Sequence, residues 1–134
     1  MKKIIIIILT LFLFTGCTTY KSKDTIPNLK KITEDADKIV SVTIIDNSYS
    51  IEGKTCYDAP VSEIVKLFKD VTKVKESKVR VTDSDITYTI SMEDEKIYLN
   101  FESKYLLDNN TSYELKDFSH PNFVKNYTEV VCPE

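Results

Sequence analysis

Two neighbouring stretches in which apolar and polar residues alternate constrain the fold most strongly. The first spans positions 86–92 and the second positions 97–102, and the acidic run 93–95 separates them. Side chains in a strand point alternately to the two faces of a sheet. The pattern therefore predicts two antiparallel strands with one buried and one wet face. The apolar members are Ile86, Tyr88, Ile90, Met92, Ile97, Leu99 and Phe101.

Shorter patterns predict the other strands of the sheet. Residues 38–45 are rich in β-branched side chains, with Val40, Val42 and Ile44 expected on one face. A turn at 46–48 and a second strand at 49–55 would complete a hairpin. Val79 and Val81 alternate with polar residues, and residues 112–116 follow a turn at 108–110. The expected sheet has about five or six strands.

One main amphipathic helix is expected at about 60–72. Pro60 suits the first turn, where a missing N–H costs nothing. The apolar residues that follow lie on one side of a helix. They are Val61, Ile64, Val65, Leu67, Phe68 and Val71. A helical turn near Pro121 and an extended end are expected in the tail. The fold class is α+β, with this helix packed across the sheet.

The first 17 residues run from two lysines through an apolar stretch to Leu13-Phe14-Thr15-Gly16-Cys17, an arrangement that resembles the signal peptide and lipobox of bacterial lipoproteins. Lys2 and Lys3 precede an apolar run from Ile4 to Phe14, which is shorter than the about 20 residues that span a bilayer. Leu13-Phe14-Thr15-Gly16-Cys17 follows, with a small residue before the cysteine. The resemblance implies cleavage before Cys17 and a lipid on its thiol. It also implies a location on the extracytoplasmic face of the cell membrane.

The expected organisation has three parts. Residues 1–16 are the signal peptide, 17–37 the lipid anchor and a flexible tether, and 38–134 a single small domain. The tether is expected because it is polar and lysine-rich and contains Pro27. The layout of 38–134 also resembles small uncharacterised lipoproteins of low-GC bacteria, although no motif in it supports a family.

The net charge argues against nucleic acid as a partner. The chain carries 18 basic and 21 acidic residues, a formal charge of −3. Loss of residues 1–16 removes Lys2 and Lys3, which leaves 16 basic residues and a charge of −5. Proteins that bind nucleic acid usually carry a basic footprint. The expected partners are the membrane, through Cys17, and an envelope protein, a peptide or a wall component.

Cys56 and Cys132 remain after lipidation of Cys17. Outside the membrane, two cysteines can oxidise to a disulfide, and we expect this pair to do so. Two free thiols are the alternative. A redox centre is not expected, because the chain has no C-x-x-C motif.

The chain offers no convincing catalytic, metal or cofactor set. His120 is its single histidine, so a Cys–His pair would have to use it with Cys56 or Cys132. In the expected disulfide, neither cysteine would be free to act as a nucleophile. The acidic clusters 83–85 and 93–95 do not fit a calcium loop, and zinc ligands are too few. We expect no enzyme activity, no metal and no cofactor.

The hypothesis that remains is a membrane-anchored binding module without enzymatic activity. Tyr98 and Tyr113 are its expected interaction surface, because tyrosine combines an apolar body with a polar tip. An immunity or protective lipoprotein that acts against an external toxin or enzyme is the alternative. A small envelope hydrolase that uses His120 is a third, weaker one.

Overall fold

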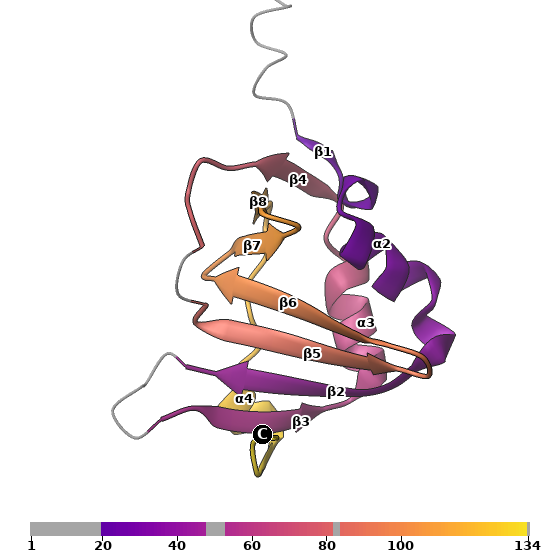
Figure 1. Ribbon diagram of the computed structural model, residues 1–134, viewed down its shortest axis with the longest axis vertical. Helices are drawn as coiled ribbons and strands as arrows, with labels where there is room; N and C mark the ends of the chain where they lie inside the picture. Colours follow the sequence, from indigo (N-terminus) through magenta and orange to yellow (C-terminus); the bar gives the residue numbers. More distant parts are fainter. Residues whose placement is uncertain (1–19, 48–52, 82–83, 134) are drawn as a thin grey trace, which may run out of the picture.

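The structure is a computed structural model that describes residues 20–47, 53–81 and 84–133. These residues form one antiparallel sheet with helices on one face (Figure 1). The strands are β1 (Lys21–Ser22), β2 (Ile39–Asp46), β3 (Thr55–Ala59), β4 (Lys73–Glu76), β5 (Ile86–Met92), β6 (Lys96–Glu102), β7 (Tyr105–Asp108), β8 (Thr111–Leu115) and β9 (Thr128–Val130). The helices are α2 (Pro27–Glu34), α3 (Val61–Lys69) and α4 (Phe123–Asn126), with short 3-10 turns η2 (Lys23–Thr25) and η3 (Ala36–Lys38).

The nine strands follow the order β1-β4-β8-β7-β6-β5-β2-β3-β9. The α+β class is confirmed, but the expectation of five or six strands was too low. The three strands without a predicted counterpart, β1, β4 and β7, are only two to four residues long. Such strands are too short to show a clear alternation.

The two strands predicted from alternation are confirmed as β5 and β6. Tyr88 pairs with Leu99 and Ile90 with Ile97, so the apolar residues share one face and are buried. The acidic run 93–95 forms the turn between the strands, where the Met92 amide donates to the Glu95 carbonyl at 2.8 Å. This pair lies in the middle of the sheet and anchors the core.

Helix α3 confirms the predicted amphipathic helix, with ends at 61 and 69 in place of about 60 and 72. Pro60 precedes the first helical residue and has extended backbone angles. Ile64, Val65 and Phe68 are buried against the sheet. The Phe68 ring lies 5.3 Å from Tyr88 and 6.2 Å from Phe101, centroid to centroid. The apolar side of α3 therefore packs against the sheet, as the spacing of its residues predicts.

The segment expected to be a flexible tether is part of the fold from residue 20 onward. Ile26, Leu29 and Ile32 are fully buried, and the latter two lie on α2. In the sequence they are only three apolar residues among polar ones, but their spacing puts them on one side of the segment. The tether expectation was wrong for 20–37, and residues 17–19 lie outside the described residues.

The hairpin between the first two predicted strands is confirmed, with shifted bounds. β2 pairs with β3 from Val42–Ala59 to Asp46–Thr55. β3 begins where the predicted strand 49–55 was to end, and residues 49–52 lie outside the described residues. The register shifts between Ile39 and Ser41, which marks a bulge. Val40 is therefore 65% exposed and not on the buried face with Val42 and Ile44 as expected.

The predictions for the second half hold in part. The strand expected at 112–116 is β8. The tail has a helical turn, α4, and then the extended strand β9, as expected. Val79 and Val81 do not lie in a strand. The chain there continues beyond β4 without pairing, and Val81 is buried while Val79 is exposed.

Candidate functional site

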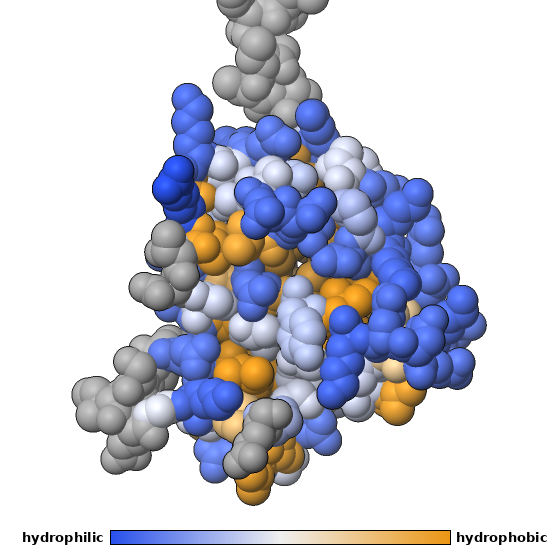
Figure 2. Space-filling view, viewed as in Figure 1, coloured by the Kyte–Doolittle hydropathy of each residue, from blue (hydrophilic) through white to orange (hydrophobic). Residues whose placement is uncertain are grey.

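The sheet has an inner face, covered by helices, and an outer face. Figure 1 shows β5 and β6 passing in front of α3, so the outer face is turned toward the reader. The register places the residues that alternate with the buried set on this face. They include Thr43, Ile45, Thr87, Thr89, Tyr98, Asn100, Leu107 and Ser112. In Figure 2 this face is mostly polar, with separate apolar patches.

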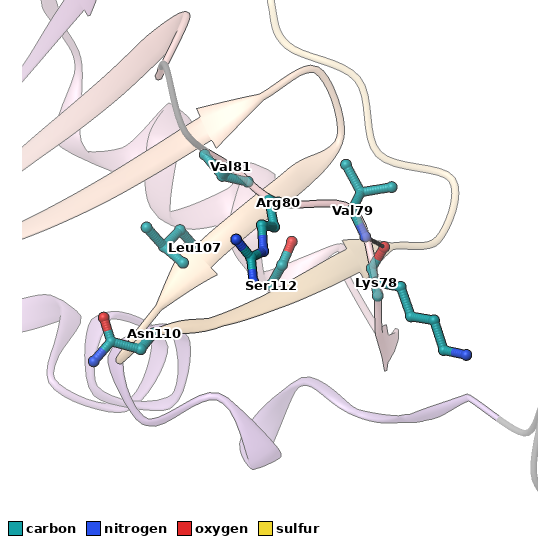
Figure 3. Close-up of a pocket in the computed structure, with 8 residues that line it drawn as sticks. Lys78, Val79, Arg80, Val81, Leu107, Asn110 and Ser112 are labelled. Atoms are coloured by element: carbon teal, nitrogen blue, oxygen red, sulfur yellow. Dashed lines mark hydrogen bonds between the residues drawn. The ribbon is translucent and has the colours of Figure 1, made fainter.

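A hollow of about 470 Å³ lies on the outer face over β7 and β8. Its floor contains Leu107 and Ser112, which are paired across the two strands. Its wall is the segment 77–81, which follows β4 and lies outside the strands, and Asn110 stands at its rim (Figure 3). The Ser77 amide donates to the Ser112 carbonyl at 2.8 Å, which holds the wall against the floor.

Arg80 and Lys78 are the cationic residues of the lining, and Arg80 is the single arginine of the chain. Its side chain reaches over the strands that form the floor (Figure 3). It forms no ion pair with any residue in the described ranges 20–47, 53–81 and 84–133. An arginine fork usually pairs with carboxylates or phosphates. Here this donor capacity remains open toward the hollow.

Ser112 adds an unpartnered polar group to the same hollow. Its side chain is only 8% exposed, and its Oγ has no hydrogen-bond partner among the described residues. A buried hydroxyl without a partner costs about 1–3 kcal/mol. An external acceptor or donor in the hollow would remove that cost.

The rim of the hollow depends on a tight turn between β7 and β8. Asn109 and Asn110 have φ values of +50° and +66°. Asparagine tolerates this left-handed region better than other non-glycine residues. The predicted turn at 108–110 is confirmed. The turn brings the Asn110 amide, which has both donors and an acceptor, to the rim.

A cluster of lysines lies beside the hollow, at the edge formed by β1 and β4. Glu114 on β8 binds Lys75 at 3.1 Å and Lys104 at 2.6 Å. These hydrogen bonds hold the pKa of Glu114 below its ordinary value and raise the pKa values of both lysines. The Tyr20 ring lies between Lys75 and Lys116, 5.0 Å and 5.2 Å from their Nζ atoms.

Two further lysines extend this cluster, which we call the basic edge. Lys21 on β1 faces Val74 on β4, and Lys73 on β4 faces Ser22 on β1. Both lysine side chains are exposed. The five lysines come from distant parts of the chain, so no basic run is visible in the sequence. The basic edge consists of Lys21, Lys73, Lys75, Lys104 and Lys116.

Tyr98 and Tyr113 do not form one surface. Tyr98 pairs with Thr89 on the outer face and is 53% exposed. Tyr113 pairs with Leu106, which is fully buried, and packs partly against the core on the inner face. The two residues that the sequence analysis grouped as one surface therefore lie on opposite faces of the sheet. Tyr98 alone is placed to contact a partner on the outer face.

His120 is tied into the core and not presented in a cleft. The Ser103 carbonyl can only accept, so the Nε2–H of His120 donates to it at 2.7 Å. Nδ1 then accepts from the Tyr88 hydroxyl at 2.8 Å. Burial lowers the pKa of His120, and the bond to Ser103 and the Asp46 and Asp85 carboxylates oppose the shift. Burial therefore favours the neutral ring, and both of its nitrogens have hydrogen-bond partners.

The disulfide between Cys56 and Cys132 is present, with Cα atoms 5.1 Å apart. It joins β3 to the segment that follows β9, and it leaves neither thiol for nucleophilic chemistry. Cys17, the expected site of lipidation, lies outside the described residues. Among the described residues, no group of three His, Cys, Asp or Glu side chains is placed to hold a metal ion. No helix in the described ranges is long and apolar enough to cross a membrane.

The hollow and the basic edge were not found from the sequence. Arg80 and Ser112 meet only because β4 pairs with β8, and β4 itself was not predicted. The signals available were weak: one arginine in a lysine-rich chain, and a serine in a short strand.

Comparison of the chain with protein-family models finds no match. Searches among curated proteins and among solved structures find no match either.

Proposed function

We propose that the protein is an extracytoplasmic, lipid-anchored binding module whose outer sheet face receives its partner. The observation that carries the proposal is the hollow in that face, which contains Arg80 and a buried Ser112 hydroxyl, neither of them paired with any described residue. Proteins usually pair such groups. Their unused hydrogen-bonding capacity supports a role in binding a ligand. The neighbouring Tyr98 adds an exposed aromatic ring for a larger partner.

The proposed anchor would hold the domain close to the membrane. Only three residues separate Cys17 from Lys21, the first residue of β1. An extended chain spans at most about 3.6 Å per residue, so the sheet edge would lie within about 15 Å of the lipidated residue. The basic edge is the part of the domain brought to the surface. Lysines in that position are attracted to anionic lipid headgroups.

The same geometry would place the hollow near the lipid. β8 is the second strand from β1, and strands are spaced about 4.8 Å apart, so the floor stands roughly 10 Å from the edge. A partner bound there would lie at the membrane surface or in the adjoining wall.

Site-specific photocrosslinking in intact cells tests the proposal. A photoreactive amino acid would replace Tyr98 on the outer face or, as a matched control, the exposed Lys66 on α3. We expect a discrete adduct from position 98, none from position 66, and loss of the adduct in a Cys17→Ser chain. Equal labelling from both positions, or no adduct from a folded protein, would contradict the proposal.

A further inference from the structure

We propose that the hollow binds the terminal carboxylate of a peptide whose last side chain is small and aliphatic. The inference rests on the proposed function and specifies the ligand of the same site. It is carried by three properties of the hollow: its charge, its unpartnered hydroxyl and its apolar walls.

The charge of the hollow selects an anion. Among the described residues, its lining contains Arg80 and Lys78 and no aspartate or glutamate. The unpaired fork of Arg80 can donate two parallel hydrogen bonds to one carboxylate. No described residue supplies that carboxylate. The cation therefore remains available for a ligand.

The Ser112 hydroxyl completes the donor set. Its Oγ lies in the floor with no partner among the described residues, in the same hollow as Arg80 (Figure 3). A carboxylate has about four lone-pair positions, and the arginine fork fills two of them. The hydroxyl and the Asn110 amide, which is also part of the lining, can donate to the remaining positions.

The apolar walls and the size of the hollow select the rest of the ligand. Leu107, Val79 and Val81 lie beside the polar groups and favour an aliphatic side chain. The Lys78 side chain points away from the other lining residues (Figure 3). Arg80 with the neutral donors of the hollow therefore matches the single charge of a carboxylate better than the double charge of a phosphate. The volume of about 470 Å³ falls in the range of about 300–1,000 Å³ typical of small-ligand sites. It exceeds what a bare carboxylate would fill and leaves room for a short peptide end.

An NMR titration of the membrane-extracted protein in detergent micelles tests the inference. Arg80 is the single arginine, so its guanidinium Nε–H gives one assignable resonance. The probes are N-acetyl-alanyl-alanine with a free carboxylate, the same dipeptide as its amide, propionate and inorganic phosphate. We expect the free acid to shift the Arg80 and Ser112 resonances and the amide to bind at least tenfold more weakly, because a charge-assisted pair is lost.

Variants show whether the proposed groups hold the ligand. Arg80→Gln is expected to weaken binding of the free acid at least tenfold, and Ser112→Ala several-fold. Ser112→Ala should leave the melting temperature unchanged or higher, because it removes an unpartnered buried hydroxyl. Lys96→Gln removes a positive charge from exposed β6, outside the hollow, and should change the affinity less than twofold.

Each other outcome overturns the inference in a defined way. If phosphate bound more tightly than the free acid, the ligand of the hollow would be a phosphate and not a carboxylate. If propionate bound as tightly as the dipeptide, the peptide part of the proposed ligand would be refuted. Absence of binding by the folded protein at millimolar concentrations would refute the ligand class. If crosslinks from position 98 persisted in that case, the binding module itself would stand.

Discussion

The Tyr88 hydroxyl donates a hydrogen bond of 2.8 Å to Nδ1 of His120. Tyr88 is fully buried at the centre of the sheet, and burial raises its pKa. The bond requires a neutral imidazole, since a protonated ring would present a second N–H to the hydroxyl. The tail is thereby fastened to the core by an imidazole, a group whose ordinary pKa lies near neutral pH and is lowered here by burial.

This bond predicts a loss of stability as the pH falls. Burial lowers the pKa of His120 in the folded protein below about 6.5, its value in the unfolded chain. The unfolded state therefore takes up the proton first. The stability due to the neutral ring is complete above about pH 6.5 and is lost as the pH falls through the folded pKa. Urea unfolding at pH 5, 6, 7 and 8 measures the slope.

His120→Gln is the control for that slope, because glutamine does not titrate. We expect a flatter pH dependence between pH 5 and 7. Glu114, whose pKa is lowered, loses its contribution only as the pH falls below about 4.5, outside this window. An equal slope in wild type and variant would show that His120 is not the titrating group.

Tyr88→Phe is expected to lower the free energy of unfolding by about 1–2 kcal/mol at pH 7. It leaves the ring in place but removes the donor to Nδ1 of His120. Combination with His120→Gln in a double-mutant cycle isolates the coupling of the pair. Strict additivity of the two losses would mean that the bond contributes nothing.

Reduction of the Cys56–Cys132 disulfide is expected to lower stability by about 4 kcal/mol. The two cysteines are 76 residues apart, and the chain-entropy model assigns about this value to such a loop. β9 pairs with β3 over only three residue pairs. Its amides should exchange far faster after reduction than those of β5. Hydrogen exchange with and without reductant measures both effects, and unchanged protection of β9 would contradict the second.

Leu29→Ala is expected to cost about 2–5 kcal/mol, the range for large-to-small changes in a core. The prediction follows from the full burial of Leu29 on α2. Val124→Ala on α4 is the matched surface control, since Val124 is 76% exposed, and should change stability by less than about 0.5 kcal/mol. A negligible loss for Leu29→Ala would return residues 20–37 to the role of a tether.

Lysine acylation followed by mass spectrometry tests the orientation at the membrane. In anionic vesicles, Lys21 and Lys73 of the basic edge should react several-fold more slowly than in detergent. Lys54 and Lys125 lie near the opposite edge, are exposed, and should react equally in both. High salt should abolish the difference, because it screens exposed charges. Equal protection of all four lysines would refute the orientation.

Local patterns predicted the parts of the fold that depend on local residues. The alternation in β5 and β6, the stripe of α3 and the turn at 108–110 each follow from side-chain periodicity or backbone preference over a few residues. The bulge that exposes Val40 could not be predicted, because it depends on the register between β2 and β5. β4, with the sequence Lys-Val-Lys-Glu, has no periodicity of its own and is defined only by its neighbours.

The candidate site was less predictable than the fold. Arg80 and Ser112 are brought to one hollow by strand pairing, and nothing near either residue indicates the other. The disulfide was predicted from location and cysteine number, without knowledge of the pairing of β3 with β9. The lysines of the basic edge gather for the same reason as the hollow residues. A surface site that is built from residues on different strands leaves no pattern in any one stretch of the sequence.

The strand order also has a mechanical consequence. If Cys17 were held by lipid and a ligand in the hollow were pulled away, the load would run from β1 through β4 to β8. β1 and β4 share only two residue pairs, which makes this joint the weak point of the path. Strands β5, β2, β3 and β9 would bear none of the tension. β1 and β4 would separate at this joint, while the half of the sheet that is closed by the disulfide stayed folded.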